Sequence, residues 1–428
     1  MKKIVLAAGL VLAAASSSSA QSVTFYRDVL PILQNRCQSC HRAGEIGPMP
    51  LGTYEDARPY ARAIKQATAT RKMPPWNVDA PAGKFHNDPS LSTHELETLT
   101  TWADSGAPAG DAKDAPPSRA FAQGWTIGRP DVVFEAQPYD VPPSGTIEYT
   151  YLIVPTGFTG DRWMSAAEVR PGNRAVMHHA NVYVRERDSA WLREYPKGRW
   201  FVPGERGQRF GLGGASSAGA SAREQMIAGY IPGRPAKQVP AGYGMLVPAG
   251  ADLIFQMHYT TNGAPTKDQT KIGFVFAKDR PGRRVIRIQA SNADFVIPPG
   301  ASSHPVSATA LLGVECELID AYPHMHFRGR SMSLAALFPG GREEPLVNVP
   351  RYDFNWQLVY EFSNRMTLPK GTRLTANATF DNSPSNRLNP DPNASVRWGD
   401  QSWEEMMVGF FDVAVPPDTD LRNVVMRQ

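Results

Sequence analysis

Residues 247–263 read VPAGADLIFQMHYTTNG, in which one mostly apolar run, Leu253–Thr260, lies between turn-forming Pro, Gly and Asn residues. From about Trp125 onward short runs of this kind recur, and their alternation of apolar and polar residues predicts β-strands. Their spacing is typical of β-sandwiches. About 300 residues are too many for one sandwich, so we expect two all-β sandwich domains, at residues 125–290 and 291–428. Further runs are Ile147–Val154, Ala180–Val184, Ile272–Phe276, Arg373–Phe380 and Met407–Val415.

The chain before this region has a different pattern, which predicts helices. Val23–Gln34 is amphipathic, and Tyr54–Thr70 carries apolar residues at helical spacing. Ser92 is followed three residues later by Glu95, a capping-box pattern that begins a third helix. The polar, Pro-containing stretch at 111–124 is expected to be a linker. The sequence therefore predicts an N-terminal all-α domain at residues 21–110, ahead of the two sandwiches.

Residues 1–20 have the composition of a secretory signal peptide. Lys2 and Lys3 precede an apolar stretch, Ile4–Ala15, and a small-residue cleavage site ends at Ala20. The apolar stretch is too short for a membrane span, which needs about 20 residues. No later stretch is long or apolar enough, so we expect a soluble protein that is periplasmic or secreted. A formal net charge of +4 without a basic block argues against nucleic acid as a partner.

Cys37-Gln-Ser-Cys40-His41 is a CxxCH motif, the pattern of covalent haem c attachment. Two thiols at this spacing can each bond one vinyl group, and the adjacent His then lies under the iron. The alternatives are a dithiol redox pair, which would need a βαβ context, and half of a zinc site, which would need a second ligand pair nearby. The third cysteine, Cys316, is expected to be a buried free thiol.

The sixth iron ligand is expected downstream, at Met73 in the segment RKMPPW. Pro74 disfavours a helical conformation at Met73, and a Met axial ligand raises the potential and suits electron transfer. Met49 is the competitor, but it follows His41 so closely that little chain remains to cross to the other haem face. For either Met, simple core packing is the alternative.

The stretch from Phe25 to Pro108 resembles the small class-I cytochrome c domains, on the strength of CQSCH, RKMPPW and a final helix ending in TWADSGAP. The resemblance implies an all-α cytochrome c domain that carries one covalent haem c and shuttles single electrons. Cys37, Cys40, His41 and Met73 would then be the haem-binding residues.

Five of the nine histidines fall into three groups within the β-rich region, and a Met-rich segment follows them. In a strand, residues two apart face the same side, so His324 and His326 can chelate one metal. The adjacent His178 and His179 can reach one metal only where the strand is bent or bulged, or at its end. The groups are His178-His179, His258 and His324-Met-His326, and the Met-rich segment is Trp403–Met407.

The donor types indicate which metal is expected. Imidazole alone suits zinc, copper, iron or nickel, whereas a thioether is soft and favours Cu(I). Two His and a Met therefore make a poor zinc site and argue for redox copper, with a position left open for dioxygen. Each group alone is weak, because a single His in a strand is more often a hydrogen-bonded core residue. The order HH, MHY, HMH and EEM in one β-rich region is the stronger observation.

That order resembles the copper type II, ascorbate-dependent monooxygenases, the family of the peptidylglycine α-hydroxylating and dopamine β-monooxygenases. The similarity runs from about residue 125 to the C-terminus and is carried by VMHHANVYV, FQMHYTTNG, AYPHMHFRGR and GDQSWEEMM. It implies two jelly-roll β-sandwich domains, each with one mononuclear copper. His178, His179 and His258 would bind the copper that stores and passes an electron. The copper that activates dioxygen would be bound by His324, His326 and Met406, which is preferred to Met407 because the family's Met directly follows an acidic residue.

Three positions depart from the peptide-processing members of that family. Tyr322 stands where those members have an Arg, and Val408 and Phe410 stand where they have an Asn and a Tyr. The polar anchors for a peptide carboxylate are therefore missing, and we expect a more apolar pocket.

The sequence thus predicts a multidomain chain, with an N-terminal all-α cytochrome c domain followed by two all-β jelly-roll sandwich domains. Its expected function is that of a copper-dependent monooxygenase with two copper ions, hydroxylating a small organic substrate with dioxygen. The haem would supply or relay electrons, and ascorbate or another carrier would be the external reductant. A non-enzymatic electron-transfer or copper-binding protein is the alternative, as is a copper oxidase or reductase acting on a small inorganic molecule.

Overall fold

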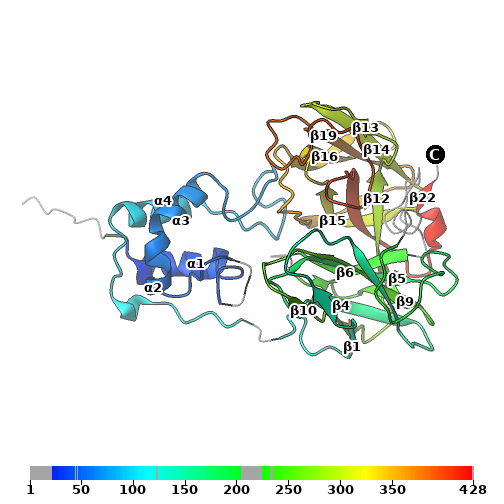
Figure 1. The fold of residues 1–428 in the computed structure, drawn as a ribbon, viewed down its shortest axis with the longest axis horizontal. Helices are drawn as coiled ribbons and strands as arrows, with labels where there is room; N and C mark the ends of the chain where they lie inside the picture. Colours follow the sequence, from blue (N-terminus) through cyan, green and yellow to red (C-terminus); the bar gives the residue numbers. More distant parts are fainter. Residues whose placement is uncertain are drawn as a thin grey trace, which may run out of the picture.

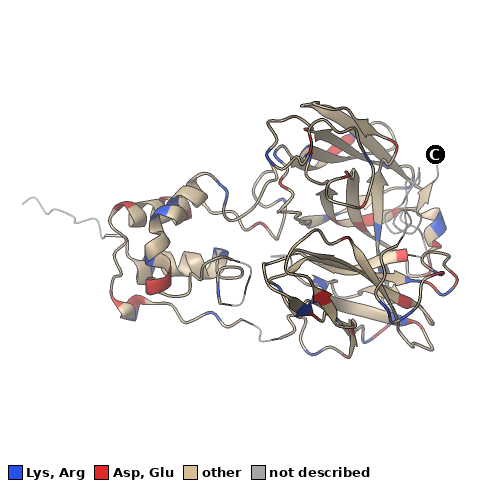
Figure 2. Cartoon of the chain, viewed as in Figure 1, with Lys and Arg blue, Asp and Glu red and all other residues tan. Residues whose placement is uncertain are grey.

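The computed structural model describes residues 22–43, 45, 47–121, 124–203, 224–231 and 235–426. The expected signal peptide, residues 1–20, lies outside the described residues. Figure 1 shows a helical segment on one side of the molecule and two packed β-sandwiches on the other. Acidic and basic residues are interspersed over both parts (Figure 2). Within the described part of the chain, no helix has the length and apolar character needed to cross a bilayer.

The N-terminal helices are short and are separated by irregular stretches. Pro59 interrupts the helix expected over 54–70, because proline lacks the backbone N–H and instead occupies the first turn of the 3-10 helix η2. The capping box expected at Ser92 is confirmed, since its hydroxyl accepts from the Glu95 N–H and the Glu95 carboxylate accepts from the Ser92 N–H. The helices are η1 (Phe25–Val29), α1 (Leu30–Arg36), α2 (Tyr54–Ala57), η2 (Arg58–Tyr60), α3 (Ala61–Ala69), α4 (Thr93–Asp104) and η3 (Ala112–Asp114).

The predicted fold class, with an N-terminal all-α cytochrome c domain, is wrong. The described chain is mostly β, and residues 76–87 pack on the second sandwich rather than on the helices. Phe85 is buried in that sandwich's core and forms a β-bridge with Phe362, while Trp76 meets Tyr360 edge-on. Helical periodicity in the flanking residues could not reveal that these aromatic side chains are buried by a distant sheet.

Three larger sheets of the described residues form the two sandwiches. The largest has nine strands in the order β1-β11-β4-β8-β12-β21-β15-β18, with β7 paired to β4. The four-stranded sheet β3-β9-β5-β6 shares a core with its first half, and the five-stranded sheet β17-β16-β19-β14-β22 shares a core with its second half. The strands of the nine-stranded sheet are β1 (Val132–Glu135), β4 (Arg162–Arg170), β7 (Lys237–Gln238), β8 (Tyr243–Val247), β11 (Lys271–Phe276), β12 (Arg283–Ser291), β15 (Cys316–His324), β18 (Tyr360–Leu368) and β21 (Val408–Val415).

The remaining strands complete the sandwiches and their edges. The four-stranded sheet contains β3 (Thr150–Pro155), β5 (Met177–Arg185), β6 (Glu224–Tyr230) and β9 (Asp252–Tyr259). The five-stranded sheet contains β14 (His304–Leu312), β16 (Gly329–Leu337), β17 (Glu343–Val349), β19 (Arg373–Phe380) and β22 (Val425–Met426). Two short pairs are β2 (Tyr139–Val141) with β10 (Thr266–Asp268), and β13 (Val296–Ile297) with β20 (Val396–Arg397); the 3-10 helix η4 spans Leu421–Asn423.

The two sandwiches share one continuous sheet. β8 of the first sandwich pairs in parallel with β12 of the second, at Tyr243–Arg283 and Gly244–Arg284. Residue 290, the expected boundary, lies inside β12. Period-two patterns predict the strands, but they do not specify which distant strands pair. His324 lies on β15 of this shared sheet, whereas His178, His179 and His258 lie on β5 and β9 of the four-stranded sheet.

Candidate metal centres

Three imidazoles from neighbouring strands converge in the first sandwich. His178 and His179 lie on β5 and His258 on β9, and their ligand nitrogens lie within 4.8 Å of one another. His179 pairs with His258 in the antiparallel ladder, and the register shifts between Met177 and His179. Such an irregularity adds a residue to one strand. It allows the adjacent His178 and His179 to face the same side.

The nitrogens of this His triad are suited to a metal ion. His178 Nδ1 lies 3.1 Å from His179 Nδ1, and His258 Nδ1 is buried without a hydrogen-bond partner among the described residues. Burial lowers the pKa of His258 to about 3 and also lowers the pKa of His178, so both rings are neutral at pH 7. Tyr149 stacks on His258 with ring centroids 4.6 Å apart. A buried nitrogen without a partner is costly unless a ligand satisfies it, and neutral imidazole suits copper or zinc.

A second pair of imidazoles lies at the end of β15. The rings of His324 and His326 have centroids 5.2 Å apart and planes at 89°. His324 Nδ1 lies 2.8 Å from Gln357 Oε1, and His326 Nδ1 lies 3.4 Å from the Glu404 carbonyl oxygen. Because each oxygen can only accept, the proton is assigned to Nδ1, and Nε2 carries the lone pair. His326 Nε2 is buried without a partner in the described chain, as a metal ligand would be before metal binding.

The strand register separates Met406 from its neighbour Met407. His324 pairs with Val408 of β21, and directly opposed residues face the same side of an antiparallel pair. Met406 packs with Val408 and Tyr322 on that face, whereas Met407 lies in the core of the second sandwich. Met406 is therefore the methionine on the His324 side, and its coordination of a metal stays a prediction.

The positions that depart from the peptide-processing enzymes surround His324. Tyr322 and Phe410 stack with centroids 4.6 Å apart, and Phe410 lies 6.1 Å from the His324 ring. Both belong to one apolar cluster with Met406 and Val408. The side chains beside His324 on this face are therefore apolar or aromatic.

Phe354 lies between the two histidine groups. Its ring stacks on His178 at a centroid distance of 5.4 Å and a tilt of 16°, and it meets His326 edge-on at 6.2 Å and 88°. The two groups, one from each sandwich, therefore face each other across a single phenyl ring. Sequence reasoning missed Phe354, because no motif marks it.

Glu405 and Arg328 support the second centre and were also not assigned a role from the sequence. The Glu405 carboxylate is fully buried and accepts from the backbone N–H groups of His326 and Arg328. Arg328 donates to Asn382 Oδ1 at 2.7 Å and to the Trp403 carbonyl at 2.8 Å. These contacts tie the HxH loop to the EEM segment. The signals available in the sequence were that Glu405 belongs to the EEM motif and that Arg328 lies two residues after His326.

The CxxCH motif lies just after α1. Cys37 caps the helix, and the N–H groups of Cys40 and His41 both donate to the Cys37 carbonyl. His41 Nδ1 lies 3.1 Å from the Met49 carbonyl oxygen, which assigns the proton to Nδ1 and the lone pair to Nε2. Burial raises the pKa of the Cys37 thiol to about 12, opposite to the lowered pKa of a redox dithiol. Two free thiols beside an oriented imidazole fit haem attachment.

The other sulfur-containing residues have different surroundings. Met73 follows α3, with its N–H bonded to the Ala67 carbonyl, and its role as an iron ligand stays a prediction. Met49 packs against the helical core. Cys316 is a free thiol buried in the core of the second sandwich.

Comparisons with known proteins do not identify a function for this chain. No family model matches the chain, and no curated protein matches it. Among solved structures, the VP2 subviral particle of infectious bursal disease virus is 8% identical, with a TM-score of 0.19, over 67% of this chain and 72% of that one. The Gx strain of the same virus gives 10% identity and a TM-score of 0.18, over 67% of this chain and 73% of that one. Similarity this low supports no argument about fold or function.

Asp400 gives a testable pH dependence of stability. Its side chain is buried and Oδ2 has no partner among the described residues, so burial, with Glu404 nearby, raises its pKa to about 8. The folded chain therefore holds a proton that the unfolded chain releases near pH 4. Stability should fall as pH rises from about 4 to about 8, with a limiting slope of about 1.4 kcal/mol per pH unit from this group. In urea unfolding across that range, Asp400→Asn should flatten the curve and the exposed control Asp418→Asn should not. An equal slope in D400N and the unmodified chain would refute the assignment.

Proposed function

We propose that this protein is a copper-dependent monooxygenase that acts in the periplasm or after secretion and hydroxylates a small organic substrate with dioxygen. The observation that carries the proposal is the pair of histidine groups facing each other across Phe354, each with a buried nitrogen that lacks a hydrogen-bond partner among the described residues. The order of the motifs, which resembles that of the copper type II monooxygenases, also supports the proposal.

Two donor sets would hold the metal. His178, His179 and His258 would hold one copper, and His324, His326 and Met406 would hold the other. Bound copper would supply one-electron redox chemistry at both centres, and the thioether of Met406, a soft donor, would favour its cuprous state. The overall reaction consumes dioxygen, two electrons, two protons and a C–H bond, and it yields an alcohol and water.

The residues around His324 and His326 orient the two imidazoles and the backbone that carries them. The Gln357 side chain and the Glu404 carbonyl orient the imidazoles through Nδ1, so that both present Nε2. Glu405 fixes the backbone of the HxH loop. Tyr322 and Phe410 form an apolar wall beside His324, which excludes water and favours a substrate that is apolar at its reacting carbon.

The experiment that tests this function traces isotopically labelled oxygen from dioxygen into the product. Copper-loaded, reduced protein is mixed with ¹⁸O₂ and a panel of small apolar substrates such as alkylbenzenes and alkylamines. The proposal expects one ¹⁸O atom in the alcohol for each dioxygen consumed. A non-enzymatic carrier would instead be reoxidised by dioxygen without label in any product.

The electrons are proposed to come through a haem c bound at Cys37, Cys40 and His41, with Met73 as the second axial ligand and ascorbate or another carrier as the external donor.

The double variant Cys37→Ala/Cys40→Ala should lose all haem that survives denaturation, as measured by the pyridine haemochrome spectrum. Cys316→Ala, which alters the third thiol, should retain it. Denaturation-resistant haem in the double variant would contradict attachment at this motif.

A further inference from the structure

The strand pairing that carries the second histidine pair ends within the HxH motif. His324 is the last residue of β15 and pairs with Val408, whereas Met325 lies beyond the ladder between β15 and β21. Met325 is fully buried, and its side chain packs in the core of the second sandwich. Its backbone N–H and carbonyl therefore need partners other than a neighbouring strand, because buried backbone polar groups without partners are costly.

The Tyr352 hydroxyl is the partner of both backbone groups. It accepts from the Met325 N–H at 3.1 Å and donates to the Met325 carbonyl at 2.8 Å. The Tyr352 N–H donates to the Arg330 carbonyl at 2.8 Å, which ties the tyrosine to β16, the strand that follows the HxH motif. Tyr352 is therefore bonded, through its backbone and through its hydroxyl, to two points of the segment that leaves the motif.

Packing around this hydroxyl leaves the motif little room to move. A Cβ atom on Gly329 would lie 2.7 Å from the Met325 Cβ and 2.8 Å from the Tyr352 Cδ1, closer than real contacts allow. The Glu405 carboxylate accepts from the His326 N–H. Both polar atoms of the peptide group that joins Met325 to His326 are therefore held, the carbonyl by Tyr352 and the N–H by Glu405.

We infer that Tyr352 is a positioning residue of the His324–His326 centre. By bonding both backbone groups of the residue between the two histidines, it sets the angle at which they present Nε2 to one metal ion. This inference rests on the proposed function, which assigns copper to that centre. A rotation of the Met325 backbone would move the two rings relative to each other, and these stand at 89° with centroids 5.2 Å apart. Groups that hold metal ligands in position contribute to metal affinity without touching the metal.

Tyr352→Phe removes one oxygen atom and keeps the ring, so it tests the two hydrogen bonds alone. We expect the Cu(I) affinity of the His324–His326 centre, measured by competition with a chromophoric chelator, to fall by about 10- to 100-fold. The affinity of the His triad should be unchanged, which also reports that the chain is folded. In the cupric protein, the EPR signal that is absent from H326A should change in Y352F, and the other signal should not.

Tyr243→Phe is the matched control, because the Tyr243 hydroxyl also makes two hydrogen bonds. It donates to Glu317 Oε1 at 2.7 Å and accepts from Arg365 at 2.9 Å. Glu317 lies on β15 like His324, but near the other end of the strand. Y243F should therefore change neither the copper affinities nor the EPR signals.

Two results would overturn the positioning role of Tyr352. One is an unchanged affinity and EPR signal at the His324–His326 centre in Y352F. The other is an equal loss of affinity in Y352F and Y243F, which would indicate a general loss of stability. Copper binding to the unmodified chain without substrate hydroxylation would refute the proposed function alone, because the affinity measurement does not depend on turnover.

Discussion

Replacing His326 with Ala is expected to abolish substrate hydroxylation and to lower the copper content from two ions per chain to one. His326 is almost fully buried, and its Nε2 has no partner other than the proposed metal among the described residues. Metal-ion catalysis contributes several kcal/mol of transition-state stabilisation, so a loss of roughly 1,000-fold or more in rate is expected. The His triad is separate from His326, so one copper should remain. Rates are measured by ¹⁸O incorporation and copper by elemental analysis.

Two further variants test whether the effect is specific to this centre. His94→Ala changes an exposed histidine on α4 and should alter neither rate nor copper content. Met406→Leu keeps the apolar volume but removes the sulfur, so it should weaken Cu(I) binding while leaving the chain folded. Two coppers and an undiminished rate in H326A, at normal stability, would contradict the assignment of this centre.

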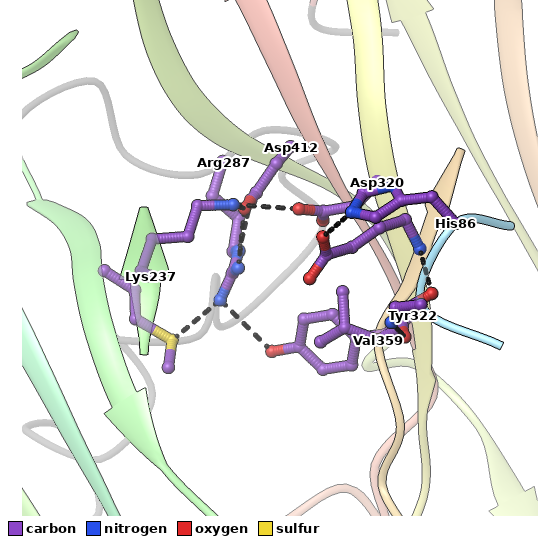
Figure 3. Close-up of polar contacts among 10 residues, drawn as sticks. His86, Lys237, Arg287, Asp320, Tyr322, Val359 and Asp412 are labelled. Atoms are coloured by element: carbon purple, nitrogen blue, oxygen red, sulfur yellow. Dashed lines mark hydrogen bonds and ion pairs between the residues drawn. The ribbon is translucent and has the colours of Figure 1, made fainter. Parts of the chain in front are cut away.

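Replacing Arg287 with Ala is expected to destabilise the fold by about 3–5 kcal/mol, the usual cost of breaking a buried ion pair from one side. Arg287 donates to both carboxylate oxygens of Asp412, at 2.6 and 2.9 Å, from the paired strands β12 and β21. Lys237 is shared between Asp412 and Asp320, so Arg287→Ala leaves two buried carboxylates with one cation (Figure 3). The measurement is the free energy of unfolding in urea.

The matched control for this prediction is an Arg–Asp pair on the surface. Arg280 bonds Asp418, and both side chains are largely exposed, so Arg280→Ala should cost no more than about 1 kcal/mol. A similarly small loss in R287A would show that the buried cluster does not hold the centre of the nine-stranded sheet together.

The β-rich part of the fold could be predicted from period-two patterns, and Leu253–Thr260 lies almost entirely within strand β9. The fold class of the whole chain could not be predicted from these patterns. The helical pattern predicts an all-α domain at residues 21–110, whereas Trp76 and Phe85 pack on the second sandwich. Likewise, no local pattern shows that β8 and β12 pair and join the two sandwiches in one sheet. Both features depend on contacts between distant residues, which local periodicity does not encode.

For the candidate site, ligand types and spacing in the sequence were enough to select residues that the structure brings together. His178, His179 and His258 converge, and the bulge that this requires is present in β5. The sequence could not identify the residues that hold these histidines in position. Phe354 and Gln357 act through contacts that depend on the folded chain, and an isolated Phe or Gln carries no motif.

The most direct measurement is an anomalous difference map, collected at the copper absorption edge from crystals of the copper-loaded protein. The account predicts two peaks, one among the three rings of the His triad and one bounded by His324, His326 and the sulfur of Met406. A map without a peak beside His324 and His326, or with a peak there that Met406 does not approach, would contradict it.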